Sequence, residues 1–218
     1  MIKVFQFSSS ASLERLTGRR ASNLDELLFL IKTCSKSSIF YHTFSAFLKL
    51  REAQVPFNSD FAVWVARMLY ERALAEQLTA VDLSEYNTLE SLRNRLIQLI
   101  EHHIQQNPLC RRKIADEPFY LYDVTRVVYL TDHFAYDLAS FRELLTNISI
   151  YSVYFHFIES RLQSQLKIDD FSAWIEESLD IPSLAQKIRQ IDISVYTLER
   201  LRSRIIQLID RHLERGDQ

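Results

Sequence analysis

Glycine is nearly absent from this chain of 218 residues, which contains only Gly18 and Gly216. Phosphate-binding loops and many tight catalytic turns need glycine, because a residue without a side chain lets backbone N–H groups close on a ligand. The sequence also lacks a P-loop, a G-x-S-x-G motif and an H-E-x-x-H motif. These absences argue against the common glycine-dependent enzyme classes.

Cysteine, excess positive charge and long apolar runs are lacking as well. Cys34 and Cys110 are too few for a disulfide framework, so we expect reduced thiols in a cytoplasmic protein. The net charge of −2 gives no broad basic surface, which argues against nucleic-acid binding. The longest near-continuous apolar stretch, residues 148–158, is about half of the roughly 20 residues that a membrane helix needs. We therefore expect no membrane association.

The chain contains an internal duplication. Residues 88–103 (TLESLRNRLIQLIEHH) and 197–212 (TLERLRSRIIQLIDRH) are identical at 11 of 16 positions. Further matched blocks occur in the same order, among them DFAVW with DFSAW and SIFYHTF with SVYFHFI. Such ordered self-similarity is the signature of a repeated structural unit. We predict one helical repeat over residues 1–107, a linker over 108–117 and a second repeat over 118–215, docked into one globular unit.

Helical periodicity dominates both repeats. In the first, apolar spacings of three and four residues predict helices after Ser22, over about 37–54, from Asp60, over about 72–80 and after the cap Thr88. The repeats open with short segments rich in aromatic residues, which look extended. We predict an all-α fold: a duplicated helical bundle with pseudo-two-fold symmetry and a short extended segment at the start of each half.

Two histidines at matched positions are the leading candidates for a binding site. A helical projection places His42 and His156 opposite the apolar face of their helices, with Ser38 and Ser152 one turn earlier. Small residues at that spacing allow another helix to come close, so these faces are expected to meet each other or another subunit. A hydrogen-bonded histidine at a helix contact is the structural alternative, and Tyr41 lies beside the first histidine.

A metal site is an alternative at the same place. His156 and Glu159 have the i, i+3 spacing that carboxylate-bridged bundles use. The first repeat has Ser45 where Glu159 stands in the second, so the two-helix ligand set is incomplete. We expect no metal and no cofactor.

The paired tryptophans form the other repeated feature. Trp64 and Trp174 each follow an aspartate by four residues. Aromatic residues at helical spacing are typical of a core, and the functional alternative is a stacking platform for a sugar or a base.

The segments LTGRRASNLDELL, SIFYHTFSAFLKL, NSDFAVWVARML and LAEQL, between residues 16 and 78, carry a family resemblance. They resemble an uncharacterised bacterial helical family catalogued only as a domain of unknown function. The resemblance extends over nearly the whole chain, and the SIxYHT and DFAxW segments are its most distinctive parts. It implies a stand-alone or appended helical domain and transfers no catalytic residue.

Three functions remain as hypotheses. The first is a non-catalytic protein-interaction or regulatory module that binds a protein partner or its own copy. The second is a small-ligand-binding protein or enzyme with a site lined by His42, His156 and Tyr41 at the contact between the halves. The third is a phosphate or nucleic-acid role for the basic clusters at residues 19–20 and 111–113.

Overall fold

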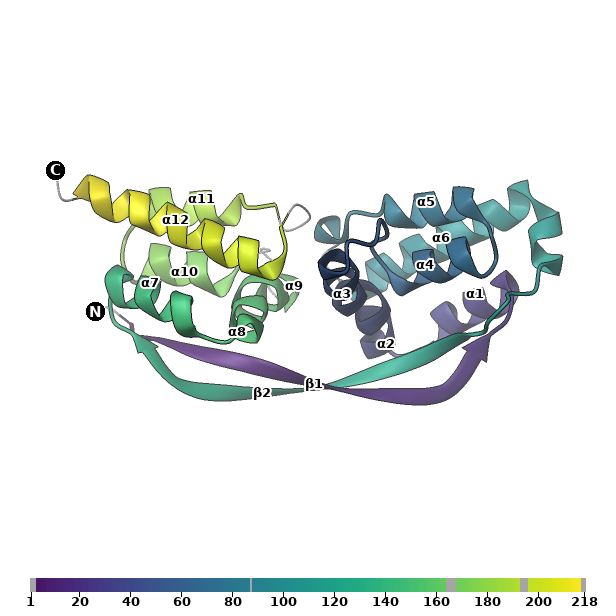
Figure 1. Cartoon of the computed structure of the whole chain (residues 1–218), viewed down its shortest axis with the longest axis horizontal. Helices are drawn as coiled ribbons and strands as arrows, with labels where there is room; N and C mark the ends of the chain where they lie inside the picture. Colours follow the sequence, from purple (N-terminus) through teal and green to yellow (C-terminus); the bar gives the residue numbers. More distant parts are fainter. Residues whose placement is uncertain (1–2, 87, 164–167, 193–195, 217–218) are drawn as a thin grey trace. The chain divides into compact units, whose positions relative to one another are not determined.

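A computed structural model describes residues 3–86, 88–163, 168–192 and 196–216 (Figure 1). Two strands, β1 (Phe5–Ala21) and β2 (Phe119–Ala135), pair as an antiparallel ribbon. The first repeat continues with α1 (Leu24–Thr33), α2 (Lys36–Phe40), the π-helix η1 (Tyr41–Ser45), α3 (Ala46–Glu52), α4 (Asp60–Arg67), α5 (Arg72–Thr79), η2 (Leu83–Glu85), α6 (Leu89–Gln106) and η3 (Pro108–Arg112). The second repeat continues with α7 (Leu138–Asn147), α8 (Ile150–Tyr154), the π-helix η4 (Phe155–Glu159), α9 (Ser160–Gln163), α10 (Asp170–Glu177), α11 (Pro182–Arg189) and α12 (Leu198–Gly216).

The all-α prediction is wrong, because the fold is α+β. Each strand of the ribbon has 17 residues and is far longer than the short opening segment that the sequence indicated. The middle of the ribbon is exposed on both faces, over residues 11–16 of β1 and 125–130 of β2. A strand that buries neither face does not show the alternation of apolar and polar residues by which strands are recognised. Residues 11–16, ASLERL, therefore read as a helix or a loop.

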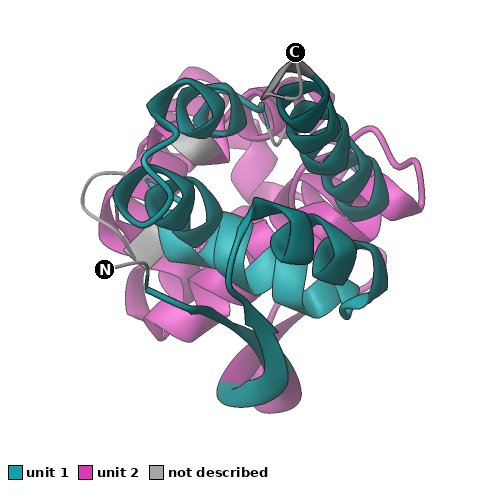
Figure 2. Ribbon diagram, turned by 90° about the vertical axis from the view of Figure 1, so that its left-hand side faces the viewer, with its two compact units in different colours: residues 1–11, 126–218 teal, residues 12–125 magenta. Residues whose placement is uncertain are grey.

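The chain divides into two compact units that differ from simple N- and C-terminal halves (Figure 2). Unit 1 contains residues 1–11 and 126–218, and unit 2 contains residues 12–125. Unit 1 therefore combines the start of β1 with the helices of the second repeat. Unit 2 combines the start of β2 with the helices of the first repeat. The repeats have exchanged the beginnings of their strands, while the repeat boundaries at residues 107 and 118 stay a sequence prediction.

Side-chain caps determine where most helices begin. Asn23, Ser35, Ser59 and Thr88 each accept a hydrogen bond from the backbone N–H three residues later, which satisfies one unpaired donor of the first turn. The predicted cap at Thr88 is thus confirmed. In unit 1, Asp137 and Asp169 have the same role at α7 and α10, and Pro182 occupies the first turn of α11.

A residue with a left-handed backbone conformation separates α4 from α5 in the first repeat and α10 from α11 in the second. Tyr70 has a φ of 57° and Asp180 a φ of 56°, at matched positions. A non-glycine residue in this region costs free energy, and glycine would normally occupy it. The scarcity of glycine thus has a structural consequence at both turns. Among the described residues, no helix combines the length and the apolarity that crossing a bilayer requires.

Candidate functional site

Each candidate histidine lies in a π-helical turn inside a longer helical segment. η1 holds His42 between α2 and α3, and η4 holds His156 between α8 and α9. A π-turn inserts an extra residue, and such turns occur frequently at functional sites. Both side chains are buried, with exposed fractions of 2% and 5%.

In unit 1, His156 connects helix α10 to strand β1. Its Nδ1 lies 2.8 Å from Oδ2 of Asp170, the first residue of α10. Its Nε2 accepts a hydrogen bond of 2.7 Å from the backbone N–H of Ser8. The ring also packs against Phe5 and Phe7 of the same strand, at centroid distances of 4.9 and 5.9 Å. His156 thus attaches the N-terminal strand to the helices of the second repeat.

Unit 2 repeats this arrangement with the strands interchanged. The Nδ1 of His42 lies 2.8 Å from Oδ2 of Asp60, the first residue of α4. Its Nε2 accepts a hydrogen bond of 3.0 Å from the backbone N–H of Tyr122 in β2. The ring packs 4.7 Å from that of Phe119. The first repeat thus binds the strand of the second repeat.

These contacts define which ring nitrogen carries the proton in both histidines. A ring nitrogen that accepts from a backbone N–H carries no proton, so the proton is on Nδ1 and is donated to the aspartate. Both nitrogens of each neutral ring are then occupied. The arrangement positions a strand, and in this geometry neither ring can bind a metal or accept a proton from a substrate.

The tryptophans hold the same two strands from α4 and α10, one helical turn after the aspartates that bind the histidines. Trp174 donates its indole N–H to the carbonyl oxygen of Lys3 at 2.6 Å, and Trp64 donates to that of Glu117 at 2.8 Å. Lys3 and Glu117 are the matched residues just before β1 and β2. Both indoles are buried, which leaves no open face for stacking a sugar or a base.

The remaining predicted site residues differ between the units. Ser152 donates to the carbonyl oxygen of Ser8 at 2.6 Å, so both backbone groups of Ser8 are bound by the second repeat. Ser38 instead accepts a hydrogen bond from the Ser35 hydroxyl at 3.0 Å. Tyr41 donates to Glu14 at 2.8 Å, and burial, together with this bond, raises the pKa of Tyr41 to about 12.

The structure thus gathers the seven candidates into two clusters. One cluster lies in unit 2 and contains Ser38, Tyr41, His42 and Trp64, of which His42 and Trp64 hold the start of β2. The other lies in unit 1 and holds the start of β1: Ser152, His156 and Trp174. The two histidines belong to different units.

Sequence reasoning missed the aspartates that orient the histidines. The sequence allowed either Ser59 or Asp60 as the cap of this helix. Ser59 caps α4 and Asp169 caps α10, so the next residue, Asp60 or Asp170, is free to bind the histidine. The repetition of aspartate in both DF-x-x-W blocks was the available signal. The backbone donors at Ser8 and Tyr122 had no signal, because any residue except proline supplies an N–H.

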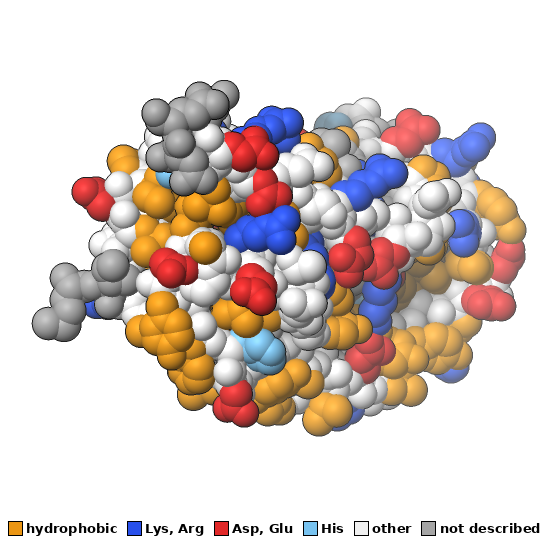
Figure 3. Space-filling view, turned by 60° about the vertical axis from the view of Figure 1, so that its left-hand side comes forward, with side chains coloured by type: hydrophobic (Ala, Val, Ile, Leu, Met, Phe, Trp, Pro, Cys, Tyr) orange, Lys and Arg blue, Asp and Glu red, His pale blue; other side chains and the backbone are white. Residues whose placement is uncertain are grey.

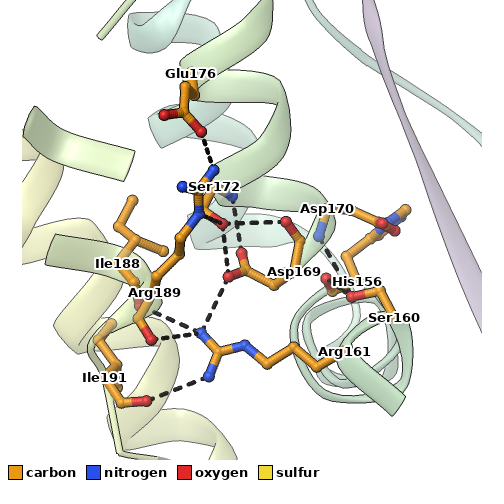
Figure 4. A network of polar contacts seen from close by, with 10 residues as sticks. All are labelled: His156, Ser160, Arg161, Asp169, Asp170, Ser172, Glu176, Ile188, Arg189 and Ile191. Carbon is orange, nitrogen blue, oxygen red and sulfur yellow. Dashed lines mark hydrogen bonds and ion pairs between the residues drawn. The ribbon is translucent and has the colours of Figure 1, made fainter. Parts of the chain in front are cut away.

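A second polar network supports the histidine cluster of unit 1 (Figure 4). Arg161 donates to Asp169 at 3.0 Å and to carbonyl oxygens at the end of α11, including that of Ile188 at 3.4 Å. The guanidinium also lies 4.0 Å from the ring centre of Phe157. In unit 2, Asn58 donates to the equivalent carbonyls of Thr79 and Val81. Different side chains thus secure the same helix end in the two repeats.

The metal hypothesis for His156 and Glu159 receives no support from the geometry. Glu159 is 1% exposed and its Oε2 lies 2.7 Å from Nη1 of Arg126. Burial raises the pKa of Glu159, and the nearby guanidinium opposes that rise. No group of three potential metal ligands occurs in the part of the chain that the structure describes.

The basic cluster of the linker contributes to an ion-pair cluster in unit 2. Glu71 is buried, and its carboxylate lies 2.8 Å from Nε2 of His103 and 2.5 Å from Nζ of Lys113. Arg111 lies 3.4 Å from Asp25. These contacts attach the linker to α5, α6 and α1.

Acid is expected to weaken unit 2 through Glu71. Burial opposes ionisation, but the hydrogen bonds from Lys113 and His103 outweigh it and bring the pKa of Glu71 below its usual 4.5. A lowered pKa in the folded state stabilises the protein above the pKa of the unfolded chain, and this contribution is lost as the pH falls through the folded value. We expect Glu71→Gln to cost roughly 1–3 kcal/mol at neutral pH and to flatten the acid dependence of stability.

Urea denaturation between neutral pH and strong acid, followed by hydrogen exchange in unit 2, tests this. Glu76→Gln is the matched control, because Glu76 is exposed on α5, the helix that begins directly after Glu71. A variant at residue 71 that keeps the acid dependence of the unmodified chain would contradict the role of this carboxylate.

Comparisons with known proteins complete the description. No curated protein matches the chain. It is similar to the solved structure of OrfY from Thermoproteus tenax, with 27% sequence identity, a TM-score of 0.80 and coverage of 96% of this chain and 95% of that one. The bacterial source that the resemblance implied stays a prediction. A family model described as a family of unknown function (DUF5752) matches residues 2–210, and the chain therefore belongs to that family.

Proposed function

We propose that this chain is a non-catalytic protein-interaction module that acts in the cytoplasm and binds a second copy of itself through the exposed edge of β2. The observation that carries the proposal is an uncharged, exposed stretch of strand. Val127, Val128, Tyr129 and Leu130 have exposed fractions of 49%, 52%, 49% and 70%. The buried, unpaired thiols of Cys34 and Cys110 suit a reducing compartment.

One edge of β2 is unpaired in the part of the chain that the structure describes, where β1 is the only strand that pairs with β2. In unit 1 the outer edge of β1 is covered at Ser8 by His156 and Ser152, whereas no such side-chain bond from the described residues covers residues 127–130 of β2. An uncovered edge of β-branched and aromatic residues is a template for a further strand. Figure 3 shows apolar side chains along the lower rim of one face, on the side where the ribbon runs in Figure 1.

The sequence of this edge is complementary to itself. If two copies pair antiparallel about Tyr129, Val128 of one copy lies opposite Leu130 of the other. Residues directly opposite share one face of a sheet, so two apolar pairs would flank the central tyrosines. A symmetric dimer requires such a self-complementary patch.

The first repeat has charged residues where the second has this apolar edge. Glu14 and Arg15 occupy the positions of Val128 and Tyr129. They form ion pairs within unit 2, Glu14 with Lys49 at 2.5 Å and Arg15 with Asp123 at 3.1 Å. Charges on an edge strand oppose pairing with another chain. Of the two repeats, only the second therefore has a strand edge that favours pairing with another chain.

Analytical ultracentrifugation over a wide concentration range tests the proposal. The unmodified chain is expected to shift from monomer to dimer, weakly, because a single strand edge buries less surface than a standard interface. Val128→Glu with Tyr129→Arg, which copies the first repeat, is expected to remain monomeric. Leu109→Glu with Ile114→Arg is the control, because these exposed apolar residues lie outside the ribbon. A monomer at every concentration, or a charged variant that still dimerises, would refute the proposal.

A further inference from the structure

We infer that the groove between α11 and α12 of unit 1 binds a small phosphate ester with an apolar or aromatic group. The groove has a volume of about 550 Å³, within the usual range for small-ligand sites. Its described lining comprises Leu184, Lys187, Gln190, Ile191, Asp192, Tyr196, Arg204, Leu208, Arg211 and His212.

Three cationic side chains converge on this groove. Arg204 and Arg211 are seven residues apart on α12, so they lie two turns apart on one face, and Lys187 lines the groove from α11. Lys187, Arg204 and Arg211 form no ion pair with the carboxylates of the described residues. Asp192 contributes the one carboxylate of the lining. Two guanidinium groups and an ammonium group suit the several oxygens of a phosphate.

The rest of the lining determines what the phosphate can carry. Leu184 and Leu208 are buried and form an apolar floor, and Tyr196 adds an aromatic ring. A bare anion would leave this apolar surface in contact with water, whereas an ester with a ring or an alkyl group would cover it. The small size of the groove and the overall charge of −2 favour a small ester over a nucleic acid.

Unit 2 contains a groove at the corresponding helix pair, with less charge and with a lining that matches at four positions. It lies between α5 and α6, has a volume of about 560 Å³, and is lined by Gln77, Arg95, Leu99, Glu101 and His102, among others. By the repeat alignment, Gln77 replaces Lys187 and His102 replaces Arg211, while Arg95 corresponds to Arg204. The carboxylate in this groove, Glu101, bonds Lys32 at 2.6 Å. The groove of the second repeat therefore has two more cationic side chains than the groove of the first.

An NMR titration of the full-length chain with phenyl phosphate tests the inference, with phenol and inorganic phosphate as partial probes. We expect one saturable site, with amide shifts confined to α11 and α12. Lys187→Gln with Arg211→His, which copies unit 2, is expected to weaken binding at least about tenfold, because two charge-assisted bonds are lost. Lys36→Gln with Arg20→His makes the same changes on exposed residues elsewhere and is expected to leave binding unchanged.

The reverse exchange provides an independent result. Gln77→Lys with His102→Arg is expected to create a second site on α5 and α6 and to double the stoichiometry. Absence of saturable binding, equal affinity of the chain and its Lys187/Arg211 variant, or phenol binding as well as phenyl phosphate would overturn the inference. A single-stranded oligonucleotide that binds through Lys187 and Arg211 far more tightly than phenyl phosphate would overturn it in favour of nucleic acid.

Discussion

Phe7→Ala is expected to destabilise unit 1 by about 3–5 kcal/mol, the usual cost of deleting a buried phenylalanine ring. Phe7 is fully buried and stacks on Phe141 of α7 at 5.4 Å, with Phe171 of α10 at 6.1 Å. The helices that lose this packing follow Phe7 by more than a hundred residues in the sequence. The helices that directly follow β1 belong to unit 2 and are expected to keep their stability.

Hydrogen exchange by mass spectrometry resolves the two units. In Phe7→Ala, protection is expected to fall in α7–α10 and to persist in α1–α6. Leu121→Ala is the mirror variant, because Leu121 is the matched residue of β2 and is buried in unit 2. Phe29→Ala is the control at an exposed site and should change stability by less than about 0.5 kcal/mol. Loss of protection in α1–α6 on replacing Phe7 would show that the strand packs against its own repeat.

His156→Ala is expected to cost about 2–4 kcal/mol, because it leaves the buried N–H of Ser8 without its acceptor and opens a cavity beside Phe5. His42→Ala is expected to have a similar effect on unit 2, through the N–H of Tyr122. Chemical denaturation gives the loss, and hydrogen exchange assigns it to a unit. Replacement of the exposed His133 provides the control.

A catalytic or ligand-binding role would give a different pattern. The alanine variants would then keep the stability of the unmodified chain and lose only a bound molecule or an activity. Stability unchanged in both variants would contradict the positioning role of the histidines.

Local sequence signals predicted the helices well. Thr88 and the 3.6-residue period after it predicted α6. These features depend on residues close together in the chain. The family membership, too, follows the resemblance that the first-repeat segments carried.

Features that depend on contacts between residues far apart in the sequence could not be predicted from local patterns. The ribbon could not be predicted because residues such as Ser12, Glu14 and Arg15 show no alternation on a strand exposed at both faces. The exchange of strands was left open, because Phe5 and Phe119 are apolar residues that suit either set of helices. The partners of the histidines escaped prediction because one is a capping-type aspartate and the other is a backbone N–H.

The central claim is that each set of helices is completed by the strand of the other repeat. Nuclear Overhauser effects from the Phe7 ring, measured on selectively labelled protein, test it most directly. The account predicts cross-peaks from Phe7 to Phe141 and to the ring of His156. Cross-peaks from Phe7 to Phe61 and His42, the core of the first repeat, would contradict it.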